Sequence, residues 1–194
     1  MYRFLSLFGL VILVAMVACN KGKEDVTTRK LDNNETSALI MDGIRPQLTG
    51  TWHMKEVAIS PFAPGTNEVG IYKDTVLKDF ANLEITLIKY ETPFDKLYND
   101  VSGSLNYKNK RYEVGFRLLA YNRYLPKKVG PQASALFEFR SVIVGTRPTE
   151  PEELNLQHLG LIGENYNIEI SADGKTMTWK GQSRSVKNIL FTKR

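Results

Sequence analysis

Cysteine and histidine are almost absent from this chain of 194 residues, which contains one cysteine, Cys19, and two histidines, His53 and His158. A single cysteine excludes a disulfide within the chain. The two histidines lack the close spacing of zinc-binding motifs, and there is no second thiol to complete such a site. We therefore expect no bound metal, and no residue pattern calls for a cofactor.

Sequence motifs of common enzymes are also missing. The chain has no Gly-x-Ser-x-Gly nucleophile elbow, no glycine-rich phosphate loop and no Glu-His zinc helix. Any two of its 21 acidic residues can come together in the folded protein, so the sequence alone does not exclude a catalytic pair of carboxylates like that of glycosidases. Because no residue set forms an activated site, we expect a protein that is not an enzyme and has no catalytic residues.

Long apolar runs are confined to the N-terminus, where Phe4 to Ala18 follows the single charge of Arg3. As a helix this run would reach roughly 22 Å, which is short of the ~30 Å hydrocarbon core of a membrane. We therefore expect residues 1 to 18 to be a cleaved signal peptide. Val17-Ala18-Cys19 resembles the lipobox of bacterial lipoproteins. The resemblance implies that Cys19 carries lipid and that the membrane is a partner through this anchor.

Residues 19 to 45 lack sustained periodicity and are rich in charge, so they are predicted to form a lipidated tether, with at most a helical turn at residues 36 to 43. Lys23-Glu24-Asp25 resembles the export signal of Bacteroidota surface lipoproteins, although a solvated linker gives the same triplet by chance. Together with the lipobox, this resemblance implies a lipid-anchored protein of the outer membrane or cell surface.

Helical periodicity is scarce beyond the tether, and alternation with a period of two dominates from Leu48 onward. The predicted strands are 51–57, 83–87, 101–107, 111–121, 135–144, 166–170, 176–179 and 187–192. One short helix is expected at Thr75 to Asn82, where Val76, Leu77 and Phe80 fall at helical spacing. Successive strands without long helices between them favour antiparallel pairing, in a closed barrel or a two-sheet sandwich.

Leu48-Thr49-Gly50-Thr51-Trp52 leads into the first predicted strand, and the chain ends on basic residues. These features resemble bacterial lipocalin-like domains, which implies an all-β, antiparallel barrel of about eight strands over residues 46 to 194. In that family the tryptophan closes one end of the barrel and an arginine packs over its ring. The resemblance thus implies that Trp52 is a structural plug, paired with Arg194 or Arg184, an arrangement that cation–π attraction favours.

Positive charge is not concentrated in this sequence, whose formal net charge is +5. The loop from Tyr121 to Lys128 combines aromatic and basic residues, which can stack on or pair with an anionic ligand. It lacks the continuous basic stripe of nucleic-acid binding proteins, and a solvated connection between strands is the simpler interpretation. We expect no nucleic-acid partner.

Two functions of different classes fit these patterns. The barrel can be a carrier that holds a small apolar or amphiphilic ligand, with Tyr112, Phe116, Phe137 and Phe139 as candidate binding residues on its inner face. Alternatively, its interior is filled, and it is an interaction module of an envelope assembly. In that case the long loops at 60–74, 122–134 and 145–163 would crowd an open end and present a surface to a protein or glycan.

Overall fold

The computed structural model describes residues 33–88, 101–120, 131–140 and 150–194, which belong to one compact unit spanning Asp32–Arg194. Cys19, the predicted signal peptide and the loop from Tyr121 to Lys128 lie outside the described residues. No helix in the described part has the length and apolarity to cross a membrane. The elements are α2 (Asn33–Leu48), β1 (Gly50–Ile59), α3 (Gly65–Glu68), β2 (Thr75–Leu87), β3 (Val101–Tyr107), β4 (Lys110–Ala120), β5 (Ala133–Phe139), α6 (Pro151–His158), β6 (Glu164–Ile170), β7 (Thr176–Gly181) and β8 (Val186–Lys193).

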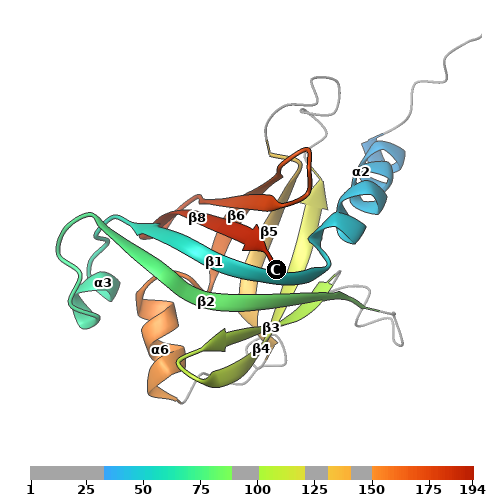
Figure 1. The fold of residues 1–194 in the computed structure, drawn as a ribbon. Coiled ribbons are helices and arrows are strands. Elements are labelled where there is room, and N and C mark those ends of the chain that lie inside the picture. Colours follow the sequence, from blue (N-terminus) through green and yellow to red (C-terminus); the bar gives the residue numbers. More distant parts are fainter. Residues whose placement is uncertain (1–32, 89–100, 121–130, 141–149) are drawn as a thin grey trace, which may run out of the picture. The chain divides into compact units, whose positions relative to one another are not determined.

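The eight strands form a closed antiparallel barrel in which each strand pairs with the next in sequence and β8 pairs back onto β1 (Figure 1). This confirms the predicted all-β class and selects a barrel over a sandwich. The turn between β3 and β4 is tight because Lys108 and Asn109 both adopt positive φ, at 48° and 62°, a backbone twist that suits a two-residue hairpin. Closure of the barrel gives most strands a hydrogen-bonded neighbour on both edges.

Strand alternation places one apolar row of each strand inside the barrel. In β4 the buried residues include Tyr112, Val114, Phe116 and Leu118, which are every second residue along the predicted strand 111–121. In β6 every second residue from Glu164 to Ile170 is buried. This regular alternation is the reason the sequence pattern was sufficient to predict these strands.

The helix predicted at Thr75 to Asn82 is wrong, because these residues form the first half of β2. They pair with β1 through a register that shifts at Asp79, where the strand carries one extra residue. Asp79 has φ of 48°, the conformation that a bulge can require. The extra residue breaks the period of two and leaves Val76, Leu77 and Phe80 at intervals that imitate a helix.

The structure differs from the predicted tether at its C-terminal part, since residues 33–48 form the helix α2 and the compact unit begins at Asp32 rather than at residue 46. Four apolar side chains of α2 are buried: Ile40, Met41, Ile44 and Leu48. They recur at intervals of one, three and four residues, which puts them on one face of the helix. The helix lies against β4 and β2.

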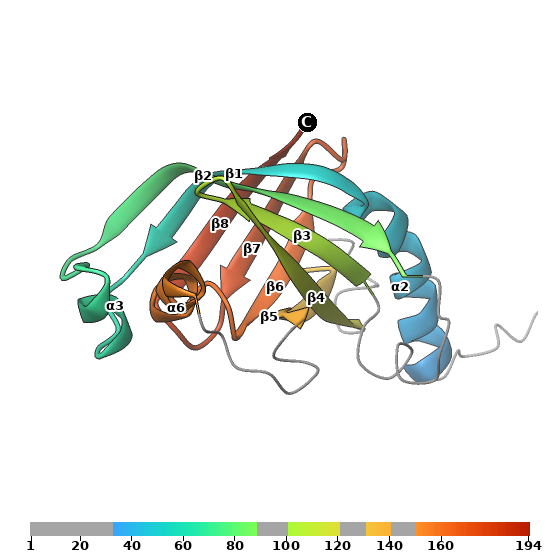
Figure 2. The same ribbon diagram turned by 90° about the horizontal axis from the view of Figure 1, so that it is seen from below.

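The helix α6 forms within the predicted loop 145–163, at the end of the barrel opposite to α2 (Figure 2). It begins with a capping box, in which Glu150 and Glu153 each accept a hydrogen bond from the other's backbone N–H. Leu156 and the following Leu159, Leu161 and Ile162 are buried. In the described part of this loop, apolar side chains of the α6 segment therefore enter the core.

Candidate binding site

Trp52 lies at the start of β1, is fully buried, and donates a hydrogen bond from its indole Nε1 to the carbonyl oxygen of Leu48 at 2.7 Å. The cation over its ring is Lys193, whose Nζ lies 5.1 Å from the ring centroid. Arg194 instead donates its backbone N–H to Thr51. The side chain of Arg184 points to the carbonyl of Ile162. The ring position of Trp52 thus agrees with a structural role, with a lysine in place of the expected arginine.

The two histidines have separate partners. His53, on the outer face of β1, has Nδ1 3.0 Å from Asn82 Oδ1 and Nε2 2.8 Å from Asp79 Oδ1. The hydrogen bond to His53 lowers the pKa of Asp79 below its ordinary value of 3.8. His158 ends α6 and its backbone packs against Gly65. No cluster of three or more potential metal ligands exists among the described residues.

The four candidate ligand-binding residues lie together inside the barrel, because β4 and β5 pair in register. Phe116 stacks on Phe137 with ring centroids 5.0 Å apart, and Tyr112 lies 5.9 Å from Phe139. Trp179 of β7 fills the space beside them, with four rings at centroid distances of 5.0–5.4 Å: Phe116, Phe137, Tyr166 and Phe191. At this level the barrel is filled by its own side chains.

Two donors inside the barrel have no hydrogen-bond partner in the described structure, the indole Nε1 of Trp179 and the hydroxyl of Tyr112. Leaving a buried donor without a partner costs about 1–3 kcal/mol, so such groups mark places where a water or ligand can be accommodated. They are the interior feature that favours a small ligand.

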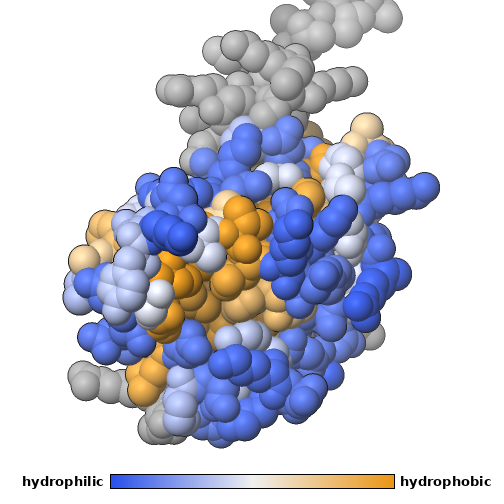
Figure 3. All heavy atoms as spheres, turned by 60° about the vertical axis from the view of Figure 1, so that its left-hand side comes forward, coloured by the Kyte–Doolittle hydropathy of each residue, from blue (hydrophilic) through white to orange (hydrophobic). Residues whose placement is uncertain are grey.

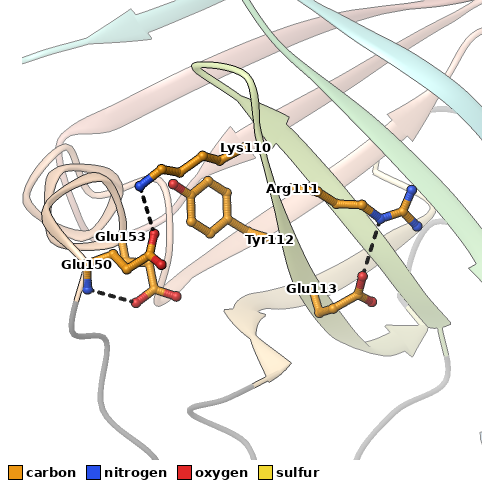
Figure 4. A pocket seen from close by; sticks show the side chains of 6 residues that line it. All are labelled: Lys110, Arg111, Tyr112, Glu113, Glu150 and Glu153. Carbon is orange, nitrogen blue, oxygen red and sulfur yellow. Dashed lines mark hydrogen bonds and ion pairs between the residues drawn. The ribbon is translucent and has the colours of Figure 1, made fainter.

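The ring of Tyr112 also borders a polar pocket of about 370 Å³ between β4 and the start of α6 (Figure 4). Lys110 bridges Glu152 and Glu150, with Nζ to carboxylate distances of 3.0 and 3.1 Å. Hydrogen bonds to these two carboxylates raise the pKa of Lys110, and the bond from Lys110 lowers the pKa of Glu152. Lys110 of β4 thus binds one carboxylate at the N-cap of α6 and one in its first turn, and these ion pairs tie α6 to the barrel wall.

A larger groove, of about 580 Å³, opens between β2 and α6. We call it the β2 groove. Its apolar lining comes from Val76, Leu77 and Phe80 of β2, Val69 and Ile71 before this strand, Tyr107 of β3 and Leu159 after α6. Its polar lining comes from Lys78, Asp79, Lys108 and Asn155. The volume lies within the range of ligand sites. Figure 3 shows an apolar hollow bordered by hydrophilic side chains on this side of the molecule.

The β2 groove follows from an interruption in strand pairing. β2 pairs with β1 from Thr75 onward, but its pairing with β3 begins only at Asn82, opposite Asn106. β3 ends at Tyr107, and no other described strand lies beside Thr75–Phe80. One edge of this half of β2 is therefore open in the described structure, and Val76 remains 53 % exposed.

The β2 groove was missed from the sequence, because its central residues were assigned to a helix. The sequence feature that indicates the groove is the apolar group Val76, Leu77 and Phe80, whose spacing matches a helix although the residues lie on a strand.

Comparison of the chain with protein-family models, characterised proteins and solved structures finds no match. Function must therefore be inferred from the described residues and their geometry.

Proposed function

We propose that the protein is a non-catalytic binding module of the bacterial envelope, anchored by lipid on Cys19, with the β2 groove as its binding site. The observation that carries this proposal is the combination of an apolar hollow with an open strand edge at one place on the barrel. Exposed apolar patches bordered by polar residues are typical of interaction sites on soluble domains. The lipocalin-like relationship and the surface location belong to the same proposal.

The filled aromatic interior supports an external site over an internal one. Trp179 contacts four aromatic rings inside the barrel, and α6 carries the buried Leu156 at one end. An internal ligand of drug size would have to displace these buried side chains.

A second candidate function is a carrier of a small apolar or amphiphilic ligand. It is favoured by the unpartnered donors of Trp179 and Tyr112, which a polar group of an internal ligand would satisfy. Native mass spectrometry of the protein from its own host separates the two functions. A molecule that leaves on unfolding, and whose loss follows Trp179→Phe, would establish the carrier.

The proposed site can be tested by photo-crosslinking in the host cell. A photoreactive phenylalanine analogue replaces Val76 in the β2 groove, and in a second variant it replaces Leu119 of β4, which is similarly exposed at 57 %. We expect a discrete adduct from position 76 and none from position 119. Equal labelling at the two positions, or none at 76, would show that the β2 groove is not the binding site.

A further inference from the structure

The open edge of β2 offers backbone hydrogen bonds to a ligand, which an apolar hollow alone does not. A strand edge presents a row of backbone N–H and C=O groups, which another strand can pair with. In the described structure, these groups lack a neighbouring strand along Thr75–Phe80, a length of about 20 Å at 3.3 Å per residue. A small hydrocarbon ligand would leave them without partners, whereas an extended polypeptide would satisfy them.

The walls of the β2 groove restrict the width of its occupant. Tyr107 and Lys108, at the β3–β4 turn, and Asn155 and Leu159, from the α6 segment, border it on the side facing β2. An occupant of this groove would lie where β3 would continue if it were longer. A single extended segment fits such a position, while a folded domain would meet the turn and α6.

Two lysines give the β2 groove a positive rim. Lys78 and Lys108 have no carboxylate partner among the described ion pairs, and Lys108 Nζ lies 5.2 Å from the centroid of the Tyr107 ring. The nearby Asp79 is engaged by His53 at 2.8 Å. At longer range, Lys78 acts on Asp79 and Lys108 on Glu152, but neither lysine is held in a close ion pair among the described residues. The apolar floor and these two cations together complement a segment that alternates apolar and acidic residues.

Resting on the proposed function, we infer that the occupant of the β2 groove is an extended, acidic and apolar peptide segment of a partner protein, added as a strand to β2 along Thr75–Phe80. Backbone pairing would supply affinity, the apolar floor would accept alternate side chains, and Lys78 and Lys108 would select acidic residues. A second copy of this chain is a poorer occupant, because it would bring the same two lysines to a groove that already carries them.

The test uses hydrogen-exchange mass spectrometry on the full-length protein purified from its host. The probe is the capped heptapeptide acetyl-Thr-Val-Glu-Val-Glu-Val-Thr-amide, and its counterpart has lysine in place of both glutamates. We expect the acidic peptide to slow exchange in residues 75–80 at concentrations about tenfold lower than the basic peptide requires, because one or two exposed ion pairs change affinity by roughly this factor.

Charge reversal provides the decisive comparison. Lys78→Glu should shift the preference toward the basic peptide, and Val76→Glu should weaken both, while Leu119→Glu on β4 should change neither. Equal response to the two peptides, no slowing at about 1 mM, or a preference unchanged by Lys78→Glu would overturn the inference. Slowing that depends on protein concentration without peptide would assign the edge to a second copy. A crosslinked adduct at position 76 that proves to be a lipid would sustain the proposed site and overturn the strand.

Discussion

Glu164→Gln should destabilise the barrel strongly although it changes few atoms. Glu164 begins β6 and is fully buried. Its Oε1 accepts hydrogen bonds from the backbone N–H groups of Asn165, Gln182 and Ser183 at 2.8, 3.3 and 3.1 Å, and from the Ser183 hydroxyl at 2.9 Å. Its Oε2 accepts from the backbone N–H of Arg184. The carboxylate thus organises the connection from β7 to β8.

The magnitude follows from counting what glutamine can replace. The amide oxygen can take the position of Oε1, but the amide nitrogen is a donor and would face the N–H of Arg184. One charge-assisted bond is lost and two donors are left opposed in a buried site, which together cost about 2–4 kcal/mol. That is a large share of the 5–15 kcal/mol typical of a whole domain.

The assay is urea unfolding of the compact unit Asp32–Arg194, with Glu169→Gln as the matched control. Glu169 lies on the same strand, but its side chain is 42 % exposed and 3.8 Å from Lys180, so its loss should change stability by less than about 0.5 kcal/mol. For an m-value of about 2 kcal/mol/M, Glu164→Gln should lower the midpoint by about 1–2 M. Equal midpoints for the two variants would refute the role assigned to Glu164.

Three further outcomes are expected. Trp52→Ala removes a buried ring and its hydrogen bond to Leu48, so it should lower the free energy of unfolding by about 3–5 kcal/mol in the same assay. Lys193→Gln, which removes only the cation over that ring, should lower it by about 0.5–1 kcal/mol. A near-zero change for Trp52→Ala would contradict the role of Trp52 as a structural plug. The lowered pKa of Asp79 should contribute stability above pH 4 that is lost as the pH falls through that pKa, and an NMR titration should return the Asp79 midpoint toward 3.8 in His53→Ala. Labelling with a palmitate analogue should mark the wild type and not Cys19→Ala, and retained label would exclude Cys19 as the lipidation site.

The regular parts of the barrel could be predicted from the sequence alone, because each strand with one buried face repeats its apolar residues with a period of two. The predicted strands 101–107 and 111–121 illustrate this, since they form the hairpin of β3 and β4 with Tyr112 and Phe116 on the inner face. The grouping of Phe116 with Phe137 on one inner face followed from the same alternation. Their register did not, since it depends on pairing between strands.

Only the tertiary structure decided those segments in which the local spacing of apolar residues disagrees with the pairing between strands. Because of the bulge at Asp79, the apolar residues of this strand are spaced as in a helix. The end of β3 at Tyr107 leaves one edge of Thr75–Phe80 without a neighbouring strand, and no short stretch of sequence indicates this. The helix α2 draws its stability from burial of a few apolar side chains against β4, and residues 33–48 alone give only weak helical signals. The sequence thus determined the barrel, because alternation is a local property. The β2 groove arises from contacts between β2, the β3–β4 turn and the α6 segment, whose free energy the local sequence does not contain.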